Sequence, residues 1–124
     1  MITDMEKTRI LNKGSFLIKK GYQPVADSNV ITYTNGDIEF NIIYEPNSPV
    51  SEMDVKFLNL NELFNVGWIA FVRDGVKVNS YDRLNCIFDL LAYVEKHYSE
   101  ITDYNYCKES DKLVDEYIAK NKKN

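Results

Sequence analysis

The feature that most constrains the fold is the segment 30–46, which reads VITYTNGDIEFNIIYEP. Apolar and polar side chains alternate on both sides of Asn35-Gly36, the dipeptide most typical of a two-residue hairpin turn. Such a turn pairs Thr34 with Asp37 and places the apolar residues on one face of the hairpin. That face holds Ile31, Tyr33, Ile38, Phe40, Ile42 and Tyr44, and the other holds Thr32, Thr34, Asp37, Glu39, Asn41 and Glu45, together with Ile43.

The rest of the chain predicts further strands and helices around this hairpin. We expect a helix over residues 3–20, strands over 53–59, 63–73 and 76–78, a helix from Asn79 or Ser80 to Ser99, and a helix over 110–121. Residues 22–29 and 45–52 are expected to be loops, and Asp74-Gly75 a second hairpin turn. Strands joined by short turns form an antiparallel meander. The predicted fold is therefore α+β: one domain over residues 1–124, with about five strands, an N-terminal helix and two C-terminal helices.

The helix predicted to end at Ser99 carries two apolar stripes. The second stripe consists of Cys86, Leu90, Tyr93 and His97. A helix that is apolar on two sides lies between layers or presents one side to a partner. The last helix needs somewhere to bury its own apolar stripe, so it is the expected cover. An exposed second stripe would instead be a partner or dimer interface.

The chain has no arrangement of residues typical of nucleophilic catalysis or of a zinc site. His97 is the only histidine, and Cys86 lies eleven residues earlier on the same predicted helix, about 16 Å away along its axis. Cys86 and Cys107 have no metal-binding spacing, so we expect two free thiols, no metal site and no cofactor. Trp68 stands in an apolar run and is expected in or near the core. The prediction is a non-catalytic protein.

Two alternative functions remain open. Asp37 together with Asp54-Val55-Lys56 resembles the spaced acidic residue and D-x-K of the PD-(D/E)xK nucleases, in which carboxylates hold Mg²⁺ and the lysine positions the attacking water. The nuclease interpretation requires both carboxylates to converge on one metal position. The other alternative is a small-ligand-binding domain, for which an apolar pocket with convergent polar groups would be the evidence.

Charge is unevenly distributed along the chain. The net charge is −4, yet residues 22–72 alone set Lys56 against seven acidic residues, a net charge of −6. The simplest interpretation is a solvated outer face of the sheet. The functional interpretation is a docking face for a basic protein, because an acidic surface attracts a basic partner and repels nucleic acid. The predicted contact residues are Asp37, Glu39, Glu45 and Asp54.

The N-terminus has no signal-peptide pattern and no apolar run reaches the length of a membrane span, so a cytoplasmic protein without membrane contact is expected. The chain is small and acidic, is predicted to form a single α+β domain, has many Tyr and Asn residues, and contains strand sequences such as IEFNIIYEP and VGWIAFVRDG. In these features it resembles the small immunity proteins encoded beside polymorphic toxins in Gram-positive bacteria. The resemblance implies tight binding to one cognate toxin, often a basic nuclease, without chemistry of its own. No motif of that family assigns individual binding residues here.

Overall fold

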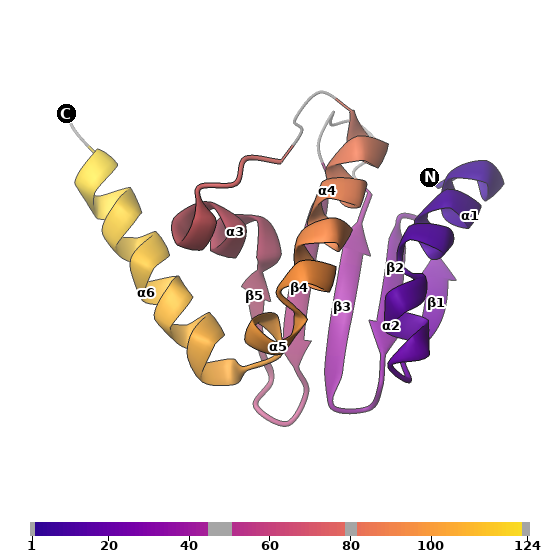
Figure 1. Cartoon of the computed structure of the whole chain (residues 1–124), viewed down its shortest axis with the longest axis horizontal. Helices are drawn as coiled ribbons and strands as arrows, with labels where there is room; N and C mark the ends of the chain where they lie inside the picture. The colour runs from indigo at the N-terminus through magenta and orange to yellow at the C-terminus, as the bar shows by residue number, and fades with distance from the viewer. Residues whose placement is uncertain (1, 45–50, 79–81, 123–124) are drawn as a thin grey trace.

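The sheet is a five-stranded antiparallel meander in the order β1-β2-β3-β4-β5. In the computed structural model, which describes residues 2–44, 51–78 and 82–122, helices precede and follow this sheet, so the predicted α+β class is confirmed (Figure 1). The strands are β1 (Gln23–Asp27), β2 (Val30–Thr34), β3 (Ile38–Ile43), β4 (Glu52–Phe57) and β5 (Glu62–Asn65). The helices are α1 (Asp4–Lys13), α2 (Ser15–Lys19), α3 (Val66–Asp74), α4 (Arg83–Lys96), α5 (Tyr98–Ile101) and α6 (Tyr104–Asn121).

The β2–β3 hairpin forms, but its turn lies one residue further along the chain than predicted. Thr34 pairs with Glu39, whereas the sequence predicted Asp37 as its partner. The predicted register is therefore wrong by two residues. Because side chains alternate across a strand with a period of two, a shift of two leaves every residue on its predicted face.

Asn35 explains the position of this turn. Its side-chain Oδ1 accepts hydrogen bonds from the backbone N–H groups of Asp37 at 2.9 Å and Ile38 at 2.8 Å. The backbone N–H of Asn35 donates to the carbonyl of Ile38 at 3.2 Å. Asn35 thus closes the base of the turn, and the residues at its tip are Gly36 and Asp37.

The segment 22–29 was predicted as a loop, and this is wrong because it contains β1. Pro24 lies within the strand, opposite Tyr33 of β2. A proline has no N–H to donate, so strands accept it mainly at the edge of a sheet, which is where β1 lies. All five residues of β1 are exposed. An edge strand of this kind lacks the buried alternation by which strands are recognised in a sequence.

The strand predicted over 63–73 is also wrong beyond Asn65, where the chain turns into α3. Asn65 Oδ1 accepts the backbone N–H of Trp68 at 2.9 Å and so caps the new helix. Gly75 ends it in the left-handed conformation, with φ of 67°. Asp74-Gly75 is therefore a helix end and no hairpin turn, and residues 76–78 form no strand.

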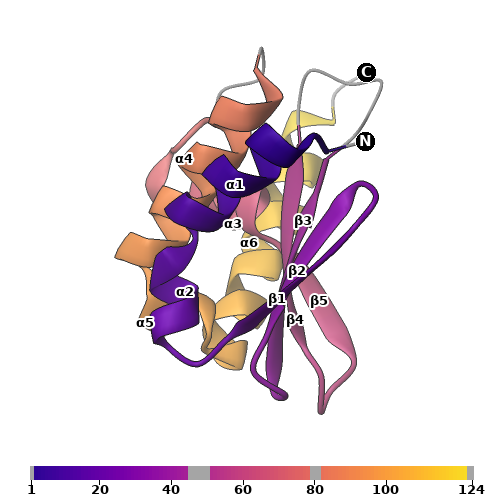
Figure 2. The same cartoon turned by 90° about the vertical axis from the view of Figure 1, so that its right-hand side faces the viewer.

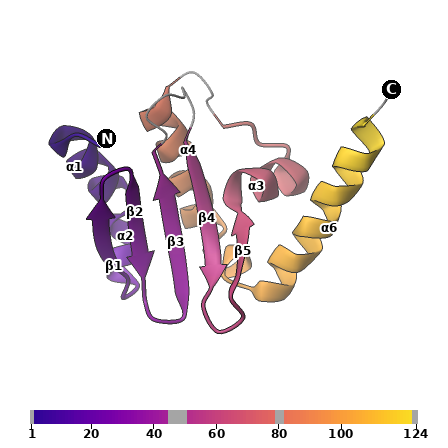
Figure 3. The ribbon, with the colours of Figure 1, turned by 180° about the vertical axis from the view of Figure 1, so that it is seen from behind.

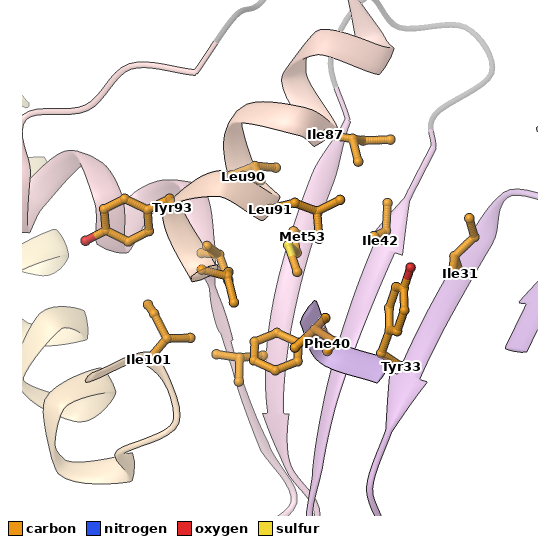
Figure 4. Packing of buried hydrophobic residues seen from close by; sticks show 14 of the residues in the cluster. Ile31, Tyr33, Phe40, Ile42, Met53, Ile87, Leu90, Leu91, Tyr93 and Ile101 are labelled. Atoms are coloured by element: carbon orange, nitrogen blue, oxygen red, sulfur yellow. The ribbon is translucent and has the colours of Figure 1, made fainter. Parts of the chain in front are cut away.

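The helices cover one face of the sheet and leave the other open. Figure 2 shows α1, α2, α4 and α5 on the same side of the strands, and Figure 3 shows the sheet from its uncovered side. Helix α6 packs against α3, beside the β5 edge. Between α4 and the sheet lies the apolar core, part of which is drawn in Figure 4. Its fully buried members include Ile31, Tyr33, Phe40, Ile42, Val55, Ile87 and Leu91.

The predicted N-terminal helix is divided at Gly14. Helix α1 begins with a capping box, in which Thr3 Oγ1 accepts the backbone N–H of Glu6 and Glu6 Oε1 accepts that of Thr3. At Gly14, a Cβ atom would lie 2.4 Å from the hydroxyl oxygen of Tyr33. The glycine is therefore needed for close packing between the helix end and β2.

Helix α4 is capped by Asp82, whose Oδ1 accepts the backbone N–H groups of Leu84 and Asn85. The predicted caps Asn79 and Ser80 lie outside the described residues. In the second stripe, Cys86, Leu90 and Tyr93 are buried and His97 is partly exposed, so the interpretation as an exposed interface is wrong.

The cover of this stripe is shared between α3, which was not predicted as a helix, and the expected last helix, whose Tyr106 contacts Tyr93. Helix α3 contacts α4 directly, and α6 contacts α3. Helix α6 also begins at Tyr104, earlier than predicted, after the cap Asp103. Because α3 was not predicted as a helix, the sequence analysis assigned the whole cover to the last helix.

Among the described residues, no helix is both long and apolar enough to cross a membrane.

Candidate functional site

The uncovered face of the sheet, called the open face below, brings together the polar residues of all five strands. Thr32 lies on it beside Asn41, and Asn41 pairs with Asp54. Thr32 Oγ1 donates a hydrogen bond to Asn41 Oδ1 at 2.8 Å. The register places on this face Gln23, Val25, Asp27, Val30, Thr32, Thr34, Glu39, Asn41, Ile43, Glu52, Asp54, Lys56, Leu63 and Asn65.

The open face is acidic, and one of its acidic residues has a basic residue opposite it. Glu39 on β3 lies directly opposite Lys56 on β4. Cross-strand neighbours of opposite charge attract one another, so Lys56 partly neutralises Glu39. Glu52 and Asp54 lie further along the same face of β4 with no lysine opposite them in the register. The acidic excess is therefore centred on the first half of β4.

Asp54 is the most constrained carboxylate of this surface. It lies between Asn41 on β3 and Asn65 on β5, in the middle of a polar row, and is only half-exposed. Burial raises the pKa of the Asp54 carboxyl, and the neighbouring charge of Glu52 raises it further. A cation of a partner placed here would offset both the burial of the Asp54 carboxylate and its repulsion by Glu52, because an opposite charge favours the ionised carboxylate.

The predicted contact residues are only partly brought together. Glu39 and Asp54 share the open face, and Asp37 lies exposed at the β2–β3 turn, at one end of it. Glu45 lies outside the described residues. The surface thus contains two of the four predicted residues, with a third at its edge and Glu52 as an acidic member that was not selected.

The same geometry separates the residues of the nuclease interpretation. The carbonyl of Asp37 accepts the backbone N–H of Leu58 at 3.0 Å. Asp54 lies four residues before Leu58, about 13 Å away along an extended strand. Asp37 and Asp54 therefore do not converge on one metal position as that interpretation requires. The described residues also contain no other group of three or more His, Cys, Asp or Glu side chains placed to hold a metal.

The two cysteines are free thiols, as predicted, and both are buried. Cys86 Sγ donates to the carbonyl of Ser51 at 3.2 Å, and Cys107 Sγ donates to that of Ile101 at 3.2 Å. Burial raises the pKa of the Cys86 thiol and raises that of Cys107 to about 12. Both groups therefore stay protonated near neutral pH, and a thiol is a much weaker nucleophile than a thiolate.

His97 belongs to a polar cluster at the C-terminal end of α4. Its Nδ1 lies 2.8 Å from Glu100 Oε1, and its Nε2 lies 3.9 Å from Asp74 Oδ2. The Tyr93 hydroxyl donates to the same Asp74 oxygen at 2.6 Å. These contacts tie the ends of α3, α4 and α5 together. Cys86 lies at the other end of α4, so no cysteine–histidine pair forms there.

Sequence reasoning missed a pocket beside the open face. Trp68 was expected in or near the core, but 38% of it is exposed; its ring contacts Phe71 and Tyr117 and lines a cavity of about 460 Å³. The error follows from interpreting α3 as a strand. The signals that favour a helix are Asn65 as its N-cap and Gly75 just after its end.

Comparison with protein-family models, curated proteins and solved structures found no significant match to this chain.

Proposed function

We propose that this chain is a non-catalytic protein-binding module, and specifically a cytoplasmic immunity protein that binds and inhibits a cognate basic toxin of a polymorphic-toxin system. The observation that supports this most is the open face. A five-stranded sheet leaves one whole side uncovered, and this side is acidic around Glu52 and Asp54. A basic protein would be steered toward such a surface, while nucleic acid would be repelled.

The half-buried position of Asp54 supports a binding role for this face. A carboxylate that is desolvated by its neighbours and lies near Glu52 weakens the fold when it is ionised. Residues that are unfavourable for stability in this way are concentrated at functional sites. An arginine or lysine of the partner, placed between Glu52 and Asp54, would turn this penalty into a favourable contact.

The test is a pull-down of the tagged chain co-expressed with the products of its neighbouring genes. We expect one basic protein to be retained at moderate salt and to be lost when Asp37 and Glu39 are both changed to lysine. Glu95→Lys is the matched control for Glu39→Lys alone, because Glu95 is exposed on α4, on the far side of the sheet from the open face. Equal retention by wild type and the double variant would contradict the choice of this surface.

A further inference from the structure

The pocket beside the open face is created by a step in the sheet. Strand β4 pairs with β3 from Glu52 onward, but β5 reaches only as far as Asn65, opposite Asp54. Beyond Asn65 the chain turns into α3 (Figure 3). The start of β4 therefore has no β5 neighbour and borders a cavity. The cavity of about 460 Å³ is lined by residues that include Glu52, Asn65, Trp68, Phe71, Lys77 and Tyr117.

Three aromatic side chains form one wall of this pocket. The Trp68, Phe71 and Tyr117 rings contact one another with centroids 5.0–6.0 Å apart. Trp68 is 38% exposed and Tyr117 is 39% exposed. Tryptophan and tyrosine that remain accessible beside an apolar hollow are the residues most enriched at the energetic centres of protein interfaces. The volume of the cavity also lies in the range of small-molecule pockets, so a small ligand is the alternative that the experiment below must separate from a protein side chain.

The polar rim indicates what kind of side chain the pocket would take. Glu52 and Asn65 belong both to the pocket and to the open face, so the two surfaces are continuous. Lys77 also lines the pocket, which disfavours a cation inside it and suits the face of an aromatic ring.

We propose that the pocket receives an aromatic side chain from the contact segment of the same basic partner, whose flanking cations meet Glu52 and Asp54. This inference rests on the proposed function and adds the chemistry of the segment that is recognised: an aromatic residue between basic ones. The open face supplies electrostatic attraction, and the pocket supplies an apolar anchoring site.

A pair of synthetic peptides tests this directly. One has four lysines around a central phenylalanine, and the other has alanine at its centre. Trp68 is the only tryptophan in the chain, so its indole N–H resonance is a single-residue reporter of the pocket. We expect the phenylalanine peptide at millimolar concentration to shift this resonance, and the alanine peptide to bind at least about fivefold more weakly. Equal binding of both peptides, or an unmoved Trp68 resonance, would overturn the proposal.

Variants locate the effect on the pocket wall. Tyr117→Ala removes part of the wall and is expected to abolish the preference for phenylalanine. Ile118→Ala is the matched control, because Ile118 is 45% exposed at the next position of the same helix and does not line the pocket. Loss of preference in both variants, or in neither, would contradict the assignment. Thermal unfolding of each variant checks that it is folded, and the peptide comparison on the wild-type protein needs no variant.

Two further probes separate this inference from its alternatives. If N-acetylphenylalanine amide binds as tightly as the phenylalanine peptide, the pocket is a small-molecule site and the anchoring proposal is wrong. A peptide with serines in place of the lysines tests the charge. If it binds as well as the basic peptide, the acidic surface plays no part and the proposed function fails, while the pocket remains an aromatic site.

Discussion

At the scale of single residues, the contact between Gly14 and Tyr33 shows how packing determines a residue that sequence patterns leave unexplained. The Tyr33 ring is fully buried, and its hydroxyl has no hydrogen-bond partner within the described chain. Burial raises the pKa of Tyr33 to about 12, so the hydroxyl stays neutral. The Tyr33 ring reaches the helix end because Gly14 has no side chain there.

We predict that Gly14→Ala destabilises the protein by about 1–3 kcal/mol, because the new Cβ overlaps with a ring that is packed on all sides. Tyr33→Phe removes the unpaired hydroxyl and is expected to be neutral or stabilising by up to about 1 kcal/mol. The loss caused by Gly14→Ala should be smaller in the Tyr33→Phe background. Chemical denaturation of the four proteins of this double-mutant cycle measures the coupling, and strictly additive effects would contradict the contact.

Asp54 gives a pH-dependent prediction at the same scale. Burial and Glu52 raise the pKa of Asp54 in the fold above its value in the unfolded chain. Such a carboxyl favours the fold fully below the unfolded pKa, and this contribution is lost as the pH rises through the folded pKa. We expect Asp54→Asn to stabilise the protein at neutral pH by no more than about 1 kcal/mol.

The gain from Asp54→Asn should shrink toward acidic pH, where Asp54 of the wild type is protonated as well. This difference is measured from the unfolding free energies of both proteins between pH 3 and 8, a range that includes the ionisation of carboxyl groups. The matched control is Asp37→Asn at the exposed turn. An Asp54→Asn variant that is less stable than wild type at neutral pH would contradict the account of this residue.

At the scale of elements, helix α3 marks the limit of inference from the sequence. Its residues 66–72 form a continuous apolar run, and such a run is compatible with a buried strand or a buried helix. Only its flanking residues, Asn65 and Gly75, distinguish the two structures. The strand interpretation ignored both signals, and the exposed position of Trp68 and its pocket were lost as a consequence.

Gly75 provides the test of that helix end. Its φ of 67° lies in the left-handed region, which costs a residue with a Cβ about 1–2 kcal/mol. We predict that Gly75→Ala lowers the unfolding free energy by about 1 kcal/mol or more. Gly75→Asn should be milder, because asparagine tolerates this conformation better than alanine. Thermal or chemical unfolding ranks the three proteins, and an alanine variant as stable as wild type would exclude the left-handed helix end.

In the β2–β3 hairpin, by contrast, the predicted register was wrong but the predicted faces were correct. The register of β2 and β3 was wrong by two residues, yet Glu39 and Asn41 were assigned to the correct face. The face depends only on the parity of each position along a strand, whereas the register depends on the exact turn. The alternation in the sequence therefore predicts the open face, but it does not predict that Lys56 lies opposite Glu39.

At the scale of the whole molecule, the two faces of the sheet differ in the residues that they carry. The helical side of the sheet contributes the apolar core, and the other side carries acidic residues that the core does not need. The antiparallel meander was predictable because short turns leave few ways to connect strands. The number of strands agreed only because the missed strand β1 took the place of the strand predicted over 76–78. The pocket was not, because it depends on where β5 stops and on how α3 and α6 pack beside it.

The most direct measurement of the central claim is calorimetric titration of the captured partner with wild type, Glu39→Lys and Glu95→Lys. Each substitution changes the net charge by the same amount, but only Glu39 lies on the open face. We predict that Glu39→Lys weakens binding at least about fivefold, equivalent to about 1 kcal/mol, and that Glu95→Lys binds like wild type. The Glu39→Lys protein should stay folded, although the change sets a lysine opposite Lys56 and costs some stability. Equal affinities for all three proteins, or equal losses in both variants, would contradict binding through the open face of the sheet.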